Sequence, residues 1–216
     1  MTSGYTPASP RMAFQMRYFT LAPKTDPPSV LNVGCSTDPL GFGEGAMHFD
    51  IDDWSKHHKY FTQGDVHQLP FPDQAYHTVL LGDVLEHVTD PQKAVVECAR
   101  VAQVRFIMTV FEEWRLPGLG QHIEAGQELA RKTVAAEGFE SNMKKHESQF
   151  PTVVLANDDE TPLLCHINQF SDADIDACVA RVQAVGFKIV EYRKAYEARH
   201  EGHPWYNWLV CMERTS

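Results

Sequence analysis

Short apolar runs rich in β-branched residues alternate with polar, glycine- and proline-containing connections along most of the chain. The run from His77 to Leu81 is the clearest, and it is typical of a strand buried on both faces of a sheet. The same pattern predicts further strands at residues 29–33, 48–52, 59–66, 104–111, 187–192 and 205–212. Apolar residues at helical spacing predict helices at residues 11–21, 91 to about 103, and 171–186. This alternation predicts an α/β fold with a parallel sheet.

Two of the predicted helices begin with recognisable capping residues. Asp90 precedes Pro91, and this pair suits a helix start because the aspartate accepts from free amides and proline fits the first helical position. Ser171 is followed three residues later by Asp174, which is the spacing of a capping box. These signals predict where both helices begin.

The length of 216 residues suits one domain with room for an insertion. We predict a single domain over 1–216, with an N-terminal arm and helix in 1–28. The regular alternation stops in 115–165, and we interpret that stretch as an insertion that covers the substrate site.

The net charge of −10 argues against a nucleic-acid backbone or an anionic membrane as the main partner. The five cysteines are odd in number and widely spaced, which indicates reduced thiols in a cytoplasmic protein. We find no apolar run of about 18 residues, so we expect no membrane span, and the N-terminus lacks the apolar core of a signal peptide.

A glycine turn and an acidic strand end suggest a nucleoside pocket. The first strand runs directly into Gly34, which lets a ligand approach the main chain, and the second ends near Asp50, which suits ribose hydroxyls. A nicotinamide-dependent oxidoreductase shares this outline, but the full G-x-G-x-x-G pattern does not follow the first strand.

With these elements placed, the chain resembles the class I S-adenosylmethionine-dependent methyltransferases. It is most similar to their small-molecule branch, the ubiquinone-biosynthesis-like or type 11 methyltransferases. The resemblance rests on four stretches, VLNVGCSTDP, HFDID, QGDVHQLPFPDQAYHTVLLGDVLEHVTDP and HINQFSDADIDACVARVQAVGFKIV. It implies one methyltransferase domain with a Rossmann-like, seven-stranded, mostly parallel sheet, helices on both faces and the last strand antiparallel.

The resemblance implies that S-adenosylmethionine binds at turns and strand ends, namely Gly34, Cys35, Ser36, Asp50, Ile51, Asp65, Val66, Leu81 and Gly82. The turn at 34–36 would pack against the methionine end of the cofactor. Asp50 would accept from the ribose hydroxyls, with Ile51 against the adenine. Asp65 would accept from the adenine amino group and the Val66 amide would donate to the ring. The carbonyls at 81 and 82 would face the ammonium group.

The sequence departs from the family pattern where Asn32 replaces an acid and Ser36 replaces a glycine. These departures leave open a catalytically weak, cofactor-binding subunit with a structural or regulatory role. The chain also lacks the Asn/Asp-Pro-Pro-Tyr signature of nucleic-acid amino methylation. We therefore predict methyl transfer to oxygen, nitrogen or carbon of a small-molecule acceptor.

Candidate groups for the acceptor site follow the predicted strands. His87 and His166 are candidate general bases, since histidine titrates near neutral pH, although each also suits a structural hydrogen-bonding role. Trp114 and His122 are candidate substrate contacts. We predict no metal site, because His122 and Glu124 are two residues apart and do not share a helix face.

Overall fold

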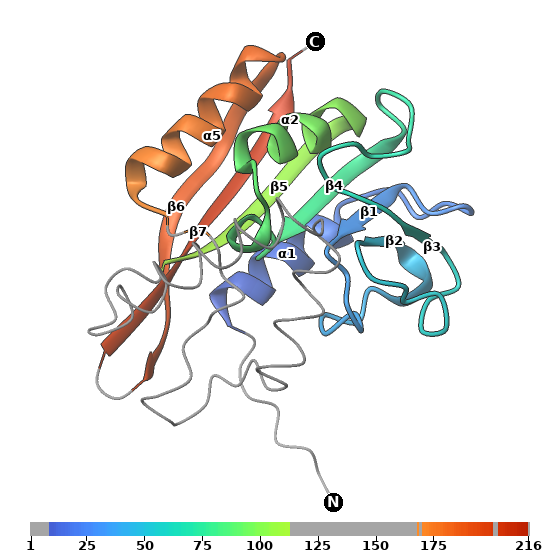
Figure 1. Cartoon of the computed structure of the whole chain (residues 1–216), viewed down its shortest axis with the longest axis horizontal. Helices are drawn as coiled ribbons and strands as arrows, with labels where there is room; N and C mark the ends of the chain where they lie inside the picture. The colour runs from blue at the N-terminus through green and yellow to red at the C-terminus, as the bar shows by residue number, and fades with distance from the viewer. Residues whose placement is uncertain (1–8, 113–167, 169, 201–202, 216) are drawn as a thin grey trace, which may run out of the picture.

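The computed structural model describes residues 9–112, 168, 170–200 and 203–215, which form a layered α/β fold (Figure 1). A single sheet of seven strands lies at its centre. The strands are β1 (Val30–Val33), β2 (Met47–Asp50), β3 (Phe61–Gln63), β4 (Tyr76–Gly82), β5 (Ala102–Glu112), β6 (Phe187–His200) and β7 (His203–Arg214). Their order across the sheet is β3-β2-β1-β4-β5-β7-β6.

All pairs among the first five strands are parallel, whereas β7 runs antiparallel to both β5 and β6. The order reverses at β1, which pairs with β2 on one side and β4 on the other. At such a switch point the chain leaves neighbouring strands in opposite directions and opens a crevice at their carboxyl ends. The seven-stranded, mostly parallel sheet with an antiparallel last strand confirms the predicted fold class.

The three described α-helices are α1 (Pro10–Thr20), α2 (Pro91–Val101) and α5 (Asp172–Ala184). Asp90 caps α2 by accepting from the Lys93 amide at 2.9 Å, as predicted. Ser171 and Asp174 form the predicted capping box at the start of α5. These helices therefore begin where short polar side chains replace missing main-chain partners.

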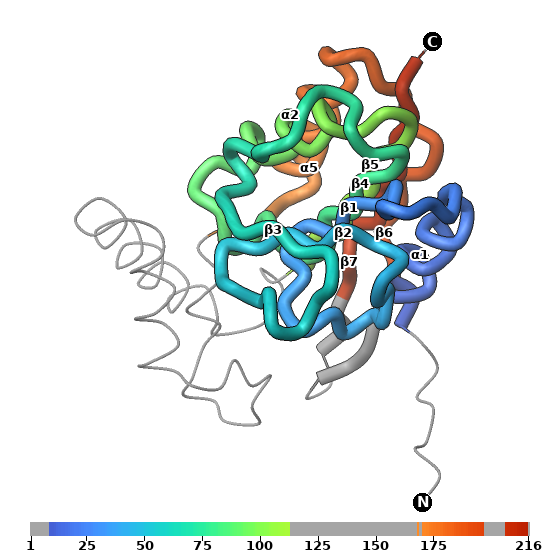
Figure 2. Tube along the Cα trace, turned by 90° about the vertical axis from the view of Figure 1, so that its right-hand side faces the viewer, coloured from blue at the N-terminus to red at the C-terminus, as the bar shows by residue number. Residues whose placement is uncertain are grey.

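The helices cover both faces of the sheet. α2 and α5 lie together on one face, over a core that contains Phe106 and Trp208. α1 lies on the opposite face, where Phe14 and Tyr18 pack in a second core (Figure 2). Alternate residues of the central strands point to the two cores, so the strands are apolar on both faces as the sequence indicated.

The connection between β1 and β2 is shorter than an ordinary crossover, and three strands differ in length from their predictions. The only helical element of this connection is a 3₁₀ turn, Gly43–Gly45. β3 is shorter than the predicted 59–66, because the backbone leaves the sheet at Gly64. β6 and β7 are both longer than predicted. In β6, which lies at the edge of the sheet, polar residues alternate along the strand and weaken the apolar pattern from which strands were predicted.

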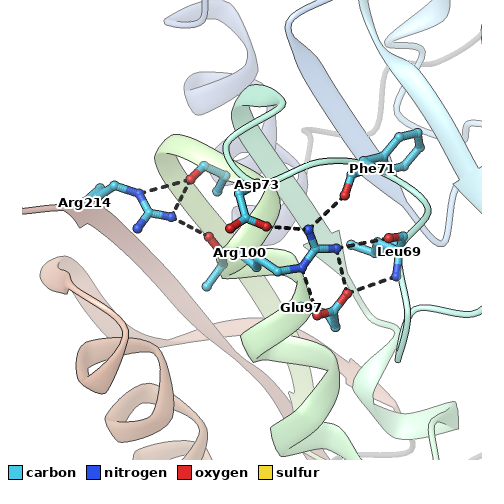
Figure 3. Close-up of polar contacts among 8 residues, drawn as sticks. Leu69, Phe71, Asp73, Glu97, Arg100 and Arg214 are labelled. Carbon is cyan, nitrogen blue, oxygen red and sulfur yellow. Dashed lines mark hydrogen bonds and ion pairs between the residues drawn. The ribbon is translucent and has the colours of Figure 1, made fainter.

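Arg100, near the end of α2, holds the loop that follows β3 (Figure 3). Its guanidinium donates to the Leu69 and Phe71 carbonyls and to the Asp73 carboxylate, at 2.8 to 3.0 Å. Glu97 accepts from the same guanidinium and from the Leu69 amide. One forked side chain thus fixes the loop between β3 and β4.

The predicted insertion at 115–165 lies outside the described residues. Within the part of the chain that the structure describes, no helix combines the length and the apolar character needed to cross a bilayer.

Candidate cofactor site

The turn after β1 requires glycine at Gly34. Its φ is +73°, and a Cβ built there would lie 2.2 Å from Cγ2 of Val84. The amides of Gly34 and Cys35 both donate to the Phe49 carbonyl, at 2.8 and 3.2 Å. The turn is therefore anchored to the end of β2 and has no room for a side chain.

The turn continues through two further residues in the left-handed region, although neither is glycine. The φ angles are +45° at Ser36 and +56° at Asp38. The Ser36 amide donates to Oδ2 of Asp50 at 2.9 Å, which ties the turn to the acid at the end of β2. The loop keeps the left-handed backbone conformation that glycine favours, so the backbone is strained at Ser36.

A cavity of about 300 Å³ lies at the carboxyl ends of β1, β2 and β4. Most of the predicted site residues line it, namely Gly34, Ser36, Asp50, Ile51, Asp65, Val66 and His87. Sequence reasoning missed further lining residues, namely Trp54, His67, Asp83 and Val84. Of these, only Asp83 carried a sequence signal, because it follows a glycine at the end of a strand just as Asp65 does.

Both predicted carboxylates in this cavity accept from the main chain. Asp50 accepts the Asp52 amide on Oδ1 at 3.1 Å, in addition to its bond on Oδ2. Asp65 accepts on Oδ1 from the His67 amide at 2.8 Å and lies 2.6 Å from Nδ1 of the same histidine. Nε2 of His67 accepts from the Asp90 amide at 3.1 Å, so its proton is on Nδ1, toward Asp65. The two acids are thus held in position.

A second cavity of about 90 Å³ lies on the α1 side of Gly34, which lines both cavities. Predicted residues Cys35 and Gly82 line it, together with Asn32. Asp38 also lines it: Oδ2 accepts from the Gly43 amide at 2.7 Å, whereas buried Oδ1 has no hydrogen-bond partner among the described residues. An unsatisfied buried carboxylate oxygen suits a cationic ligand, so this cavity fits the ammonium group of S-adenosylmethionine.

Helix α1 closes the smaller cavity through a chain of polar contacts. Arg11 forms an ion pair with Asp83. Gln15 donates to Oγ1 of Thr109 at 2.7 Å, and that hydroxyl donates to Asp83 at 3.0 Å. A Cβ at Gly82 would lie 2.5 Å from Nε2 of Gln15, so glycine lets the helix approach the strand end. No local pattern revealed these contacts, because they join residues far apart in the sequence.

Two predicted positions are more deeply buried than the others. The Leu81 side chain is in the core and lines neither cavity, so only its main chain is available at the strand end. Burial raises the pKa of the Cys35 thiol to about 12, with Asp50 adding to the effect. Cys35 is therefore a neutral thiol in the absence of a ligand.

Glu86 is a buried acid beside the cavity residue His87. The side chain is 1% exposed, and its Oε1 accepts from the Phe111 amide at 2.5 Å. Burial raises the pKa of Glu86 to about 7. The Glu86 carboxyl, next to His87 in the chain, can therefore hold a proton near neutral pH.

Three predicted acceptor-site residues, Trp114, His122 and His166, lie outside the described residues. Of the predicted bases and acceptor contacts, the structure places only His87 in the cavity.

Residues 42–105 match a family model described as "Methyltransferase domain". This stretch holds the second and third strands, the loop held by Arg100, and the strand that ends at Gly82. No curated protein sequence matches the chain.

Solved structures of similar fold include the YcgJ protein from Bacillus subtilis, at 13% identity and a TM-score of 0.55, over 94% of this chain and 99% of that one. A possible histamine N-methyltransferase from Thermotoga maritima matches at 13% identity and 0.56, over 95% and 89%. Magnesium protoporphyrin IX methyltransferase from Synechocystis, solved with bound S-adenosylmethionine, matches at 16% identity and 0.51, over 94% and 78%. At these identities the likeness shows a shared fold.

The matched domain supports the predicted methyltransferase class, and the solved structures share the fold of nearly the whole chain. These findings agree with the predicted enzyme class and cofactor, and they favour both over a nicotinamide-dependent oxidoreductase.

Proposed function

We propose that this methyltransferase acts on a small-molecule acceptor, at an oxygen, nitrogen or carbon atom. The observation that carries the proposal is the net charge of −10, which disfavours a nucleic-acid acceptor. The absence of the Asn/Asp-Pro-Pro-Tyr signature of nucleic-acid amino methylation supports the same proposal. The described cysteines are buried and free, which supports a cytoplasmic location.

We propose that the larger cavity holds the nucleoside half of the cofactor. Asp50 would accept from the ribose hydroxyls, with Ile51 against the adenine. Oδ1 of Asp65 is engaged by His67, which leaves Oδ2 for the adenine amino group, and the Val66 amide would donate to the ring. The close approach at Gly34 supports this placement, since the backbone can contact a ligand there.

We propose that the amino-acid half lies toward the smaller cavity, against the turn at 34–36. Asn32 supplies no charge to the ammonium group, and we assign that role to Asp38, whose Oδ1 is buried there. The Gly82 and Leu81 carbonyls would accept from the same group. Arg11 is placed to pair with the carboxylate, since it also lines this cavity. The acid missing from β1 is thus replaced by one from the loop.

When bound, the cofactor supplies a methyl group activated by the adjacent sulfonium, so positioning and water exclusion are the main tasks of the protein. We propose that His87 accepts the proton of a hydroxyl or amine acceptor as the bond to the methyl carbon forms. Its place in the cavity wall supports this role. The 115–165 insertion, with Trp114, His122 and His166, is proposed to complete the acceptor site.

The proposed cofactor pocket is tested by calorimetric titration of S-adenosylmethionine and S-adenosylhomocysteine into the parent and Asp50→Ala. We expect the variant to lose about tenfold or more in affinity, the effect of removing a charged hydrogen-bond partner. Asp53→Ala is the matched control, because this nearby acid is exposed and its hydrogen bonds are local, to the amide and side chain of Ser55. Equal affinities in the parent and Asp50→Ala would place the cofactor elsewhere.

The acceptor class is tested with a methyl-labelled cofactor and a cell extract separated into small molecules and macromolecules. We expect label in the small-molecule fraction, and none with His87→Ala at the pH where the parent is active. Label only in protein or nucleic acid would overturn the small-molecule acceptor. Cofactor binding without transfer in any fraction would favour the alternative of a structural or regulatory subunit.

A further inference from the structure

Three potential metal ligands lie close together at the turn that follows β1, in a cluster that the sequence spacing did not reveal. Cys35 belongs to the turn, His48 to β2, and His58 to the connection that leads into β3. Their ligand atoms all lie within 4.8 Å of one another. Cys35 and His48 are each 1% exposed, and His58 is half-buried at the surface side.

Hydrogen bonds orient both imidazole rings in the way that metal-binding histidines require. Nε2 of His48 lies 2.8 Å from the Gly43 carbonyl, and Nε2 of His58 lies 2.7 Å from the Ser36 carbonyl. A carbonyl can only accept, so each ring carries its proton on Nε2 and has a lone pair on Nδ1. In His48 this lone pair faces Nδ2 of Asn32 at 3.4 Å, and a bound cation would replace that long contact. A histidine whose second nitrogen donates to a backbone carbonyl is the usual arrangement around bound metals.

The donor set selects the kind of cation. One thiol and two imidazoles suit Zn²⁺ and neighbouring borderline-soft ions, whereas Mg²⁺ and Ca²⁺ require oxygen ligands. Burial disfavours the thiolate form of Cys35 in the metal-free protein. A bound cation deprotonates the thiol, so the ligand form is available when metal binds. Asp38 lies close enough to act electrostatically on both Cys35 and His48, and its negative charge offsets that of the cation.

The rings of His48 and His58 are stacked, with centroids 4.0 Å apart and planes at 14°. Lone pairs lie in the ring planes, so two parallel rings do not point at one ion. A tetrahedral site also needs ligand atoms about 3.3 to 3.7 Å apart. Binding therefore requires one ring to turn, and His58 is the one with room, because His48 is enclosed by the core.

We propose that Cys35, His48 and His58 form a binding site for a divalent cation of the Zn²⁺ type, with a fourth position open to water. The site would fix the turn of the cofactor pocket to β2 and to the following connection. This is separate from the methyl-transfer chemistry, which does not use these imidazoles.

The test uses the full chain, freed of metal with a chelator, and Co²⁺ as a spectroscopic probe. We expect stoichiometric binding with visible bands of tetrahedral Co²⁺ and a near-ultraviolet charge-transfer band from thiolate to metal. Zn²⁺ is expected to displace the Co²⁺ and abolish both signals. Cys35→Ser should remove the charge-transfer band, and His58→Gln should weaken binding at least roughly tenfold, as the loss of a ligand or its support does.

Two control variants keep the test specific. His57→Gln alters an exposed neighbouring imidazole, and Cys178→Ser alters a buried thiol on α5; both should bind Co²⁺ as the parent does. Circular dichroism checks that every variant is folded. The proposal is overturned if the charge-transfer band persists in Cys35→Ser, if His58→Gln binds as tightly as His57→Gln, or if the folded parent binds no Co²⁺.

Discussion

At the scale of single residues, the turn at 34–38 after β1 has a backbone that suits glycine, but Ser36 and Asp38 in it carry side chains. Ser36 and Asp38 both adopt positive φ, and this costs most residues roughly 1 to 2 kcal/mol. Aspartate tolerates the region better than serine because its short carboxylate bonds locally, as Asp38 does with the Gly43 amide. The strain is therefore concentrated at Ser36.

Replacement of Ser36 by glycine should stabilise the protein. We expect Ser36→Gly to raise the free energy of unfolding by about 1 kcal/mol, because glycine adopts this φ without a Cβ clash. Denaturant unfolding measures the change. The neighbouring Thr37→Gly is the control, since it lacks a positive φ and should be neutral or destabilising. A loss of stability in Ser36→Gly would show that the serine side chain outweighs the strain.

Asp38→Asn tests whether this loop acid replaces the one missing at Asn32. The variant should bind S-adenosylhomocysteine about tenfold more weakly, because it loses the charge offered to the ammonium group. Its affinity for 5′-methylthioadenosine, which lacks the amino-acid end, should not change. Asp50→Ala should weaken the binding of both ligands, and calorimetry measures the two affinities of the parent and of each variant. Equal losses for both ligands in Asp38→Asn would indicate a general distortion of the turn.

Glu86 makes stability depend on pH near neutrality. Burial raises the folded-state pKa of Glu86 to about 7, above its ordinary value, so the folded protein keeps a proton that the unfolded chain releases. Stability from this group is present at low pH and is lost as pH rises toward 7. Relative to Glu86→Gln, the free energy of unfolding of the parent should fall by up to about 1.4 kcal/mol per pH unit in that window.

The measurement is denaturant unfolding of the parent and Glu86→Gln between pH 4 and 8. Glutamine keeps an oxygen for the Phe111 amide, so the comparison isolates ionisation. Parallel stability curves for the two proteins would mean that Glu86 ionises equally readily in the folded and unfolded chains.

At the scale of elements, Arg100 connects α2 to the loop between β3 and β4 (Figure 3). Arg100→Ala should lower the free energy of unfolding by about 2 kcal/mol, since it leaves two carbonyls and Glu97 without their charged donor. Arg100→Lys should recover less than half, because an ammonium group lacks the planar fork. Arg181→Ala, which removes one exposed contact with Gln92, should be nearly neutral. Equal stabilities of Arg100→Ala and Arg181→Ala would contradict the assignment.

The elements also show why part of the fold could be predicted. Asp90 and Ser171 allowed the starts of α2 and α5 to be predicted, because a helix cap depends only on residues a few positions away. The glycine and the acids that indicated the pocket follow β1, β2 and β3, and all of them line one cavity. The approach of α1 to the strand ends could not be predicted, because Gln15 and Thr109 are 94 residues apart.

The same limit applies to the site. Asp50 and Asp65 followed strands in the sequence, and the structure brings both to one cavity. The cluster of Cys35, His48 and His58 follows no ligand spacing, because three separate segments supply it. Local patterns thus reveal strand ends, whereas contacts across the sheet depend on how the strands are ordered.

At the scale of the whole molecule, the site is built from both faces of the sheet. The larger cavity lies among strand ends and loops, and the smaller one is closed by α1 on the opposite face from α2 and α5 (Figure 2). Gly34 lines both cavities, so a ligand that spans them contacts α1 and the strand ends together. Binding should therefore stabilise α1 although it holds none of the predicted cofactor residues.

Hydrogen exchange with and without S-adenosylhomocysteine tests this coupling. A ligand concentration of about 100 times the dissociation constant stabilises the folded state by about 2.7 kcal/mol. Hydrogen exchange of the α1 amides should slow as well, because opening of this helix would expose the amino-acid end of the ligand. 5′-Methylthioadenosine should protect the strand ends but leave α1 unchanged, because it does not reach Arg11 or Asp38. Arg11→Ala should abolish the protection of α1 while the strand ends stay protected. If both ligands protect α1 equally, the helix responds to overall stability and the two cavities do not form one site.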